Sequence, residues 1–245
     1  MPVSEPTRER FVEIDGLFNV RDVGGYSVAG GGRTRWGQVY RGCQPCGLSP
    51  RALEQLTSLG LRTVIDLRED REAELEPSTP LEGVRVLRRP VYRGRFDLPA
   101  ASDLETLYLG MLDAAAAEFV EVLDRLAEPD ALPALVHCTA GKDRTGLAIA
   151  LLLSVLGTDE ATVVADFALT ETAYTAEWRA DMIARAEAVG VTPQRLALMV
   201  GSPPEVLANA LAHLRDKHGS VEAYLVAHGA EPAVLQVLRE RLVEP

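Results

Sequence analysis

A short apolar strand, a loop and a strongly apolar helix follow one another in the middle of the chain, and this run most constrains the fold. Residues 134–136 are continuously apolar, as expected of a buried strand, and residues 146–156 (GLAIALLLSVL) are typical of a buried helix. The loop between them runs from Cys138 to Arg144. Such a strand, loop and helix are a building unit of a parallel sheet covered by helices.

The loop has the residues of an anion-binding site. Its sequence, CTAGKDR, can curl round a tetrahedral anion with successive N–H groups pointing inward and the helix N-terminus behind it. The same N–H groups favour the thiolate form of Cys138, which makes it nucleophilic at neutral pH. The planar guanidinium of Arg144 could bind two phosphate oxygens, and the Thr145 hydroxyl could stabilise the sulfur as it leaves. An ordinary buried thiol is the alternative for Cys138.

The remaining loop residues are predicted to bind substrate. They are Thr139, Ala140, Gly141 and Lys142, together with Thr145. Lys142 is one of only two lysines in the chain, and its compact ammonium could reach a phosphate oxygen without displacing Arg144; a solvent-facing charge is the alternative. His137, beside the nucleophile, either orients the loop through hydrogen bonds or is simply buried in the core.

The general acid is harder to assign. A phosphate dianion repels the carboxylate of Asp143, which favours a protonated group that could donate to the leaving oxygen. Asp143 could equally pair with a cation and brace the loop. Asp66, at the carboxyl end of a predicted strand, is the second candidate for the acid, and Asp97 is the third.

The sequence CTAGKDRT at residues 138–145 resembles the signature loop of the protein-tyrosine phosphatase superfamily, and further motifs agree with its bacterial tyrosine, dual-specificity and phosphoinositide phosphatases. These motifs are FNVRDVGGY at residues 18–26, VYR at residues 39–41 and VIDLR at residues 64–68. The resemblance implies a mainly parallel central sheet flanked by helices, with Cys138 as nucleophile and Arg144 as phosphate binder. It implies hydrolysis of phosphotyrosine, with phosphoserine, phosphothreonine or phosphoinositides as further substrates.

Two details of the resemblance bear on the substrate and on the acid. Lys142 resembles the corresponding lysine of tensin-homologue lipid phosphatases, and Asp143 resembles an aspartate of myotubularins, so lipid substrates stay open. No Trp-Pro-Asp triplet precedes the loop, so the movable acid of classical tyrosine phosphatases is missing. A phosphate-binding module that has lost turnover is the less favoured alternative.

Composition limits the remaining possibilities. A chain of 245 residues with 47% hydrophobic residues can form one domain over residues 1–245, with residues 1–12 flexible. A net charge of −11 argues against nucleic acid as a partner. No apolar run approaches the roughly 20 residues of an integral membrane segment. We expect a cytoplasmic protein, with export without a signal left open, and the oligomeric state is not predictable.

No cofactor and no metal are expected. Cys43 and Cys46 have the spacing of half a zinc site, but no second such pair exists, so two free thiols are the first expectation and a reversible disulfide the second. The five arginines between residues 85 and 95 either rim the pocket or form a solvated edge paired with acids.

The pattern of apolar residues predicts an α/β sheet followed by a helical C-terminal half. Strands are expected near residues 18–28, 38–41, 63–67 and 84–88, and helices near 50–59, 103–127, 145–157, 159–168, 176–189, 192–199, 203–217, 219–228 and 231–241. Residues 170–200 are the candidate for a lid over the pocket, because Tyr174, Trp178 and Met182 recur at helical spacing. Core packing explains that stripe equally well.

Overall fold

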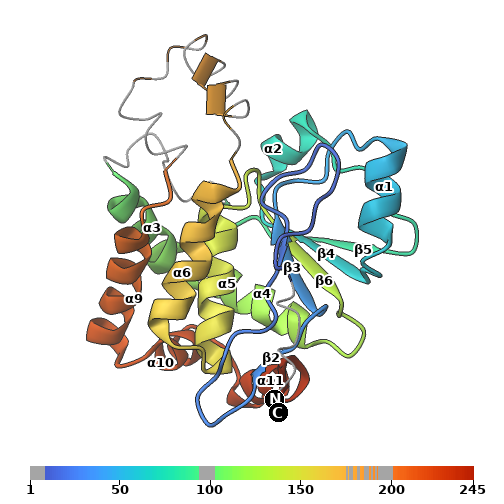
Figure 1. Cartoon of the computed structure of the whole chain (residues 1–245). Helices are drawn as coiled ribbons and strands as arrows, with labels where there is room; N and C mark the ends of the chain where they lie inside the picture. The colour runs from blue at the N-terminus through green and yellow to red at the C-terminus, as the bar shows by residue number, and fades with distance from the viewer. Residues whose placement is uncertain are drawn as a thin grey trace, which may run out of the picture.

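Five strands form a central sheet in the order β1-β3-β6-β4-β5 (Figure 1). The computed structural model describes residues 9–93, 103–174, 176, 179–180, 183–184, 188, 190, 192 and 201–245. The strands are β1 (Arg21–Asp22), β3 (Val39–Gly42), β4 (Thr63–Asp66), β5 (Arg85–Arg88) and β6 (Ala134–His137). β1 is antiparallel to β3, and the other neighbours are parallel. The expected mainly parallel sheet is confirmed.

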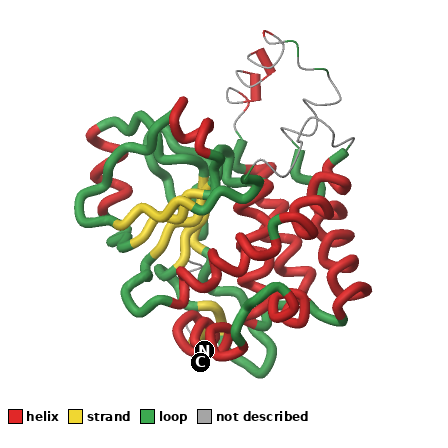
Figure 2. Tube along the Cα trace, turned by 180° about the vertical axis from the view of Figure 1, so that it is seen from behind, coloured by secondary structure: helices red, strands yellow, loops and turns green. Residues whose placement is uncertain are grey.

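Helices cover both faces of this sheet. α1 (Pro50–Thr57) lies on one face, and the helical part of the chain packs on the other, as Figures 1 and 2 show from opposite sides. That part comprises α3 (Leu104–Ala114), α4 (Ala116–Ala127), α5 (Asp143–Leu156), α6 (Glu160–Thr172), α9 (Pro204–His218), α10 (Val221–Ala227) and α11 (Pro232–Leu242). The short helix α2 (Asp70–Leu75) follows β4, and β2 (Arg33–Thr34) pairs with β7 (Val243–Glu244) in a second small sheet.

The strands feed two apolar cores because successive side chains of a strand point to opposite faces. Val39, Ile65 and Val136 belong to the large core shared with the helical part of the chain. Their neighbours pack on the other face against α1; they are Tyr40, Val64 and Leu135. Burial on both faces explains why residues 134–136 of β6 are continuously apolar.

The strand register brings the carboxyl ends of four strands to one edge of the sheet. Gly42 and Asp66 both lie beside His137, and Asp66 lies beside Arg88. Chain segments that leave β3, β4 and β6 therefore start next to one another. Cys138, the first residue after β6, starts at this edge, where ligands of open parallel sheets bind.

Several element boundaries differ from the sequence prediction. The helix expected over residues 103–127 is two helices that separate at Ala115, whose φ of −122° and ψ of 23° are not helical. The break lets α3 pack on α9 while α4 packs on α11. The strand expected near residues 18–28 is only the two-residue β1, and α2 and β7 were not predicted. A helix of six residues and a strand of two are too short to show a period.

The lid prediction falls largely outside the described residues. α6 continues to Thr172, and Tyr174 is buried with its ring edge-on to that of Phe18 at 5.7 Å. Trp178 and Met182 lie outside the described residues, as do most of the helices expected over 176–189 and 192–199 and the acid candidate Asp97. None of the helices within the described ranges has both the length and the apolar character needed to cross a bilayer.

Candidate active site

The carbonyl groups of the Cys138–Lys142 loop are bound on its outer side. The Thr139 carbonyl accepts a hydrogen bond from the Gln44 backbone N–H at 3.0 Å. The Ala140 and Gly141 carbonyls both accept from Nδ2 of Asn19, each at 3.0 Å. In a trans peptide the N–H points opposite to the carbonyl. The backbone N–H groups of residues 140–142 are therefore directed to the inner side of the loop.

His137 adds a fourth such peptide. Its Nδ1 lies 3.0 Å from the Cys138 carbonyl, and because a carbonyl can only accept, Nδ1 carries the proton. Burial lowers the pKa of His137, and the carboxylate of Asp66 opposes this only in part. The interpretation of His137 as a residue that orients the loop agrees with this contact, which turns the N–H of Thr139 inward as well.

Gly141 is required by the shape of the loop. Its φ is +68°, in the left-handed region, and a Cβ at this position would lie 2.3 Å from the Gly42 carbonyl oxygen at the end of β3. Only glycine combines that backbone conformation with so close an approach. The loop is thus seated directly on the neighbouring strand.

The nucleophile candidate lies at the bottom of this loop. Cys138 is buried at the end of β6, with 3% of its surface exposed. Thr145, in the first turn of α5, is completely buried, and its Oγ1 has no hydrogen-bond partner among the described residues. A buried hydroxyl without a partner is costly, so a ligand or the sulfur at the loop would complete it.

Arg144 is held by a glutamate that the sequence analysis did not single out. Its Nη1 and Nη2 donate to the Glu72 carboxylate at 2.5 and 2.8 Å. Thr139 Oγ1 donates to the same carboxylate at 2.7 Å. The Tyr92 ring packs against the guanidinium, with 5.0 Å between Cζ and the ring centroid. The arginine side chain is thereby fixed beside the loop.

The position of Glu72 follows from the start of α2. Its carboxylate accepts from the Glu69 backbone N–H at 2.8 Å, which completes a capping box. Burial alone would raise the pKa of Glu72, but the hydrogen bonds and charge of Arg144 and the hydroxyl of Thr139 lower it to about 2. The glutamate is therefore ionised at neutral pH. The spacing of Glu69 and Glu72 directly after a strand was the signal that could have identified it.

Asp143 lies at the first position of α5 and keeps part of its surface exposed. Its Oδ1 accepts a hydrogen bond from the Tyr108 hydroxyl at 2.8 Å and lies 3.4 Å from Nζ of Lys142. Burial, with the nearby charge of Asp143, raises the pKa of Tyr108 well above its usual value, so the phenol stays protonated and donates. No hydrogen bond from the described residues engages the other carboxylate oxygen, Oδ2.

Lys142 is directed to the protein and is almost completely buried. Its Nζ donates to the Gly201 carbonyl at 2.8 Å, just before α9. The alternative of a solvent-facing charge therefore does not apply. In this structure the ammonium anchors the loop to the segment that leads into α9, and the backbone N–H of Lys142 points inward.

Asp66 lies behind the loop in a closed ion pair. Both carboxylate oxygens bind the Arg68 guanidinium, at 2.8 Å for the shortest contact, and the Arg68 backbone N–H donates to Oδ1 at 3.0 Å. Burial would raise the pKa of Asp66, but its hydrogen bonds to Arg68 and the charge of Arg68 lower it. With 2% of its surface exposed, Asp66 is a buried, ionised group.

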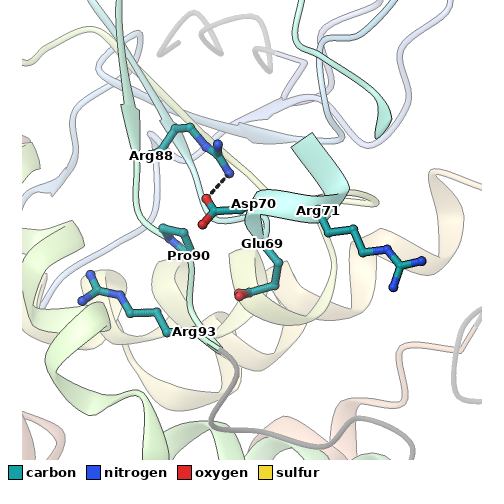
Figure 3. Close-up of a pocket in the computed structure, with 6 residues that line it drawn as sticks. All are labelled: Glu69, Asp70, Arg71, Arg88, Pro90 and Arg93. Atoms are coloured by element: carbon teal, nitrogen blue, oxygen red, sulfur yellow. Dashed lines mark ion pairs between the residues drawn. The ribbon is translucent and has the colours of Figure 1, made fainter. Parts of the chain in front are cut away.

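The arginines of β5 and its continuation form ion pairs at the surface. Arg88 pairs with Asp70 at 2.8 Å, and Arg93 pairs with Glu121 at 3.2 Å. Arg88 and Arg93 line a cavity of about 600 Å³. Figure 3 shows its lining residues, with Arg71 directed away from the pair of Arg88 and Asp70. This arrangement favours the solvated edge over the rim of the pocket for the described arginines; Arg95 is outside the described residues.

Cys43 and Cys46 are free thiols with different partners. Cys43 is buried and its Sγ accepts from the Phe18 backbone N–H at 3.3 Å, whereas Cys46 lies 3.1 Å from the Glu76 carbonyl. Burial raises the pKa of Cys43 to about 12. Within the described part of the chain, no cluster of three histidine, cysteine or carboxylate side chains has a metal-binding arrangement.

This chain is similar in sequence to known proteins over most of its length. A Cupriavidus necator protein named as a tyrosine-protein phosphatase is 31% identical over 224 residues, which cover 86% of this chain and 81% of the relative. The triple specificity protein phosphatase PtpB of Mycobacterium tuberculosis is 27% identical, covering 93% of this chain and 97% of its own. The crystal structure of Pseudomonas aeruginosa TpbA has a TM-score of 0.44 at 21% identity, covering 78% of this chain and 86% of that structure.

The family model of the tyrosine phosphatases matches residues 12–244. This range includes the Cys138–Lys142 loop, the helices on both faces of the sheet and the strands whose carboxyl ends meet at the loop. A match over nearly the whole length shows that this chain belongs to the tyrosine phosphatase family.

Proposed function

We propose that this phosphatase hydrolyses phosphotyrosine in proteins through a cysteinyl-phosphate intermediate at Cys138. The observation that carries the proposal is the orientation of the loop, whose carbonyls are bound on the outside by Asn19, Gln44 and His137. Four N–H groups at residues 139–142 are thus preorganised for the phosphate oxygens, above a buried thiol. Preorganised donors need no reorganisation when charge shifts in the transition state.

The reaction has two balanced steps. The Cys138 thiolate attacks phosphorus and forms the S–P bond while the bond to the tyrosine oxygen breaks, and the leaving oxygen takes a proton from Asp143. Water then attacks the phosphocysteine and gives its proton to the Asp143 carboxylate, and the sulfur leaves as thiolate. Arg144 binds equatorial oxygens in both steps, and the Thr145 hydroxyl donates to the leaving sulfur.

Geometry favours Asp143 over Asp66 as the acid. Asp143 is about a quarter exposed, at 27% of its side chain, and among the described residues only its Oδ1 is engaged. Asp66 is closed in its pair with Arg68, and its lowered pKa keeps it ionised, so it has no proton to give. We therefore assign Asp66 to holding Arg68 behind the loop.

Substrate binding is assigned to the loop backbone and to Arg144. Thr139, Ala140, Gly141 and Lys142 contribute their N–H groups, and Arg144 must share its guanidinium between the phosphate and Glu72. The relative PtpB is named a triple specificity protein phosphatase, which supports an assay that includes more than one kind of phosphorylated substrate. Phosphoinositides are the alternative substrates.

The test compares phosphate release by wild type, Cys138→Ser and Cys46→Ser, with chelator and reductant present. Substrates are phosphotyrosine, phosphoserine and phosphothreonine peptides and a set of phosphoinositides. Cys46 is the matched control because it is a free thiol outside the loop. We expect activity to be lost in Cys138→Ser and retained in Cys46→Ser, with radiolabelled phosphate trapped on wild type by acid quench.

Each other outcome has a distinct meaning. Release that persists in folded Cys138→Ser would exclude the cysteinyl-phosphate step. Phosphoinositide turnover that exceeds turnover of every peptide would replace the protein substrate by the lipid. Binding of phosphate without turnover in wild type would leave a phosphate-binding module.

A further inference from the structure

Two completely buried arginines stand behind the loop, and one carboxylate serves both. Arg21 on β1 and Arg41 on β3 have no exposed surface. Asp166 on α6 accepts from Arg21 Nε at 3.1 Å and from Arg41 Nη1 at 2.6 Å. The Tyr26 hydroxyl also donates to Asp166, at 2.8 Å. These three charged groups carry one more positive than negative charge in the interior.

Such an excess is unfavourable unless something nearby uses it. A buried charge costs several kcal/mol when it lacks a partner. Burial, together with the charge of Arg21, lowers the pKa of Arg41 to about 10, although Asp166 opposes this. A single neutral pair would have given the same bracing at lower electrostatic cost. The second buried arginine is therefore best explained if it acts on a further anion besides Asp166.

Arg41 reaches the loop directly. Its Nη2 donates to the Gly141 carbonyl at 2.9 Å, and the N–H of that same peptide, which belongs to Lys142, points to the inner side of the loop. A cation bound to a carbonyl polarises the peptide and strengthens its N–H as a donor. Arg41 itself lies on the outer side of the loop. It thus strengthens an N–H group that faces the anion without touching the anion.

A glycine at position 146 leaves room for the hydrogen bond between Arg41 and the Gly141 carbonyl. Gly146, in the first turn of α5, faces Arg41 and Phe167, and a Cβ there would lie 2.9 Å from the Phe167 ring and 3.6 Å from Arg41 Nη2. Arg21 acts on the same loop indirectly, through its hydrogen bond to Asn19 Oδ1, while Asn19 Nδ2 holds the Ala140 and Gly141 carbonyls. Both arginines therefore act on the Gly141 carbonyl, Arg41 directly and Arg21 through Asn19.

We infer that Arg41 is a positioning residue for phosphate binding and that Asp166 fixes the orientation of its guanidinium. This inference rests on the proposed function, since it concerns the same loop. It predicts that removing Arg41 weakens binding of a phosphate oxyanion and reduces the reactivity of Cys138, even where the protein remains folded.

The test uses the full chain with Arg41→Met, Arg41→Lys and the control Arg62→Met. Methionine keeps the apolar stem of Arg41, and lysine keeps the charge but lacks the planar fork that spans Asp166 and Gly141. Arg62 is a suitable control because its side chain is 59% exposed and, among the described residues, forms its ion pair with Asp130 at the surface. The probe is inorganic phosphate, measured as a competitive inhibitor or by calorimetry.

We expect the dissociation constant of phosphate to rise about tenfold in Arg41→Met, by less in Arg41→Lys and not at all in Arg62→Met. A tenfold rise is the effect expected from weakening one charge-assisted hydrogen bond. The rate of Cys138 alkylation by iodoacetamide at pH 7 should fall in the same order. Circular dichroism and urea unfolding establish that each variant is folded. Should Arg41→Met fail to fold, Arg41→Lys carries the same comparison.

The outcomes separate this inference from the proposed function. If Arg41→Met and Arg41→Lys lose stability yet bind phosphate as tightly as Arg62→Met, Arg41 has only a structural role and the inference is overturned. If wild type itself neither binds phosphate nor shows a reactive Cys138, the proposed function fails and the inference falls with it.

Discussion

Replacing Glu72 with glutamine removes one negative charge from the candidate active site and turns one of its two acceptor oxygens into an NH2 group. Glutamine has almost the same shape, and its remaining oxygen can still accept the hydrogen bond from the Glu69 backbone N–H, because either residue completes a capping box. The ion pair with Arg144 is lost, and with it one acceptor for the hydrogen bonds from Arg144 and Thr139. The substitution therefore measures the ion pair together with that acceptor oxygen.

The pKa of Glu72 sets the size of the effect. Its pKa falls from 4.5 to about 2 on folding. At about 1.4 kcal/mol per pKa unit this corresponds to at most about 3–4 kcal/mol. The side chain of Glu72 is 35% exposed, so solvent screening reduces the expected contribution to about 1–2 kcal/mol. For a protein of this size, that lowers Tm by roughly 2–8 °C.

The pH dependence has a definite sign. A carboxylate whose pKa is lowered by folding stabilises the native state above its unfolded pKa, and this stabilisation is lost as the pH falls through the folded pKa. The difference in the free energy of unfolding between wild type and Glu72→Gln should thus be constant near neutral pH. It should shrink between about pH 4.5 and pH 2, where wild type takes up the proton.

The assay is urea unfolding at a series of pH values between 7 and 3. Glu74→Gln is the matched control, since Glu74 is an exposed glutamate of the same helix and loses the same charge. A Glu72→Gln variant that is as stable as Glu74→Gln at pH 7 would refute the reasoning. So would a difference from wild type that does not decrease toward pH 3.

Three further substitutions test individual contacts of the loop. Tyr108→Phe should lower the rate of tyrosine release from phosphotyrosine about tenfold by releasing Asp143, yet leave the initial burst of phenol release from an aryl phosphate with a strongly acidic leaving phenol unaffected, because that first step needs no proton; equal losses in both first steps would contradict this. Gly141→Ala should weaken phosphate binding by roughly 100-fold or more, and calorimetry that finds wild-type affinity would contradict it. Lys142→Met should lower the free energy of unfolding by about 1–3 kcal/mol by leaving the Gly201 carbonyl without its donor, and an unchanged urea midpoint would show that the contact is dispensable.

The local part of the site was predictable because it lies within one continuous segment. The apolar strand, the glycine and the apolar helix give the loop its position, and Cys138 follows the strand as expected, whereas Arg144 lies in the first turn of the helix, which begins two residues earlier than expected, at Asp143. The burial of β6 was equally predictable, because a strand covered on both faces is apolar at nearly every position. Local pattern and local structure coincide in these elements.

The partners of the loop were not predictable in the same way. Glu72 meets Arg144 only because β4 and β6 are neighbours in the sheet, and a six-residue helix gives no periodic signal. Arg21, Arg41 and Asp166 are charged residues that are usually assigned to the surface, yet all three are buried. Their burial depends on charge pairing between β1, β3 and α6, which no local pattern encodes.

The acidic character of the whole chain and the binding of an anion are compatible because charge is distributed unevenly. The net charge is −11, but the charged groups at the loop and behind it are nearly balanced. The cations are Arg21, Arg41, Lys142 and Arg144, and the carboxylates bound to them are Asp166, Asp143 and Glu72.

A thiolate at Cys138 would neutralise the remaining positive charge of this set. A phosphate dianion then adds charge that the set can compensate only if Glu72 yields Arg144 to the phosphate. The ion pair between Glu72 and Arg144 therefore makes the guanidinium available only when a phosphate competes for it, and the same charge balance that holds the empty loop together would regulate binding of the anion.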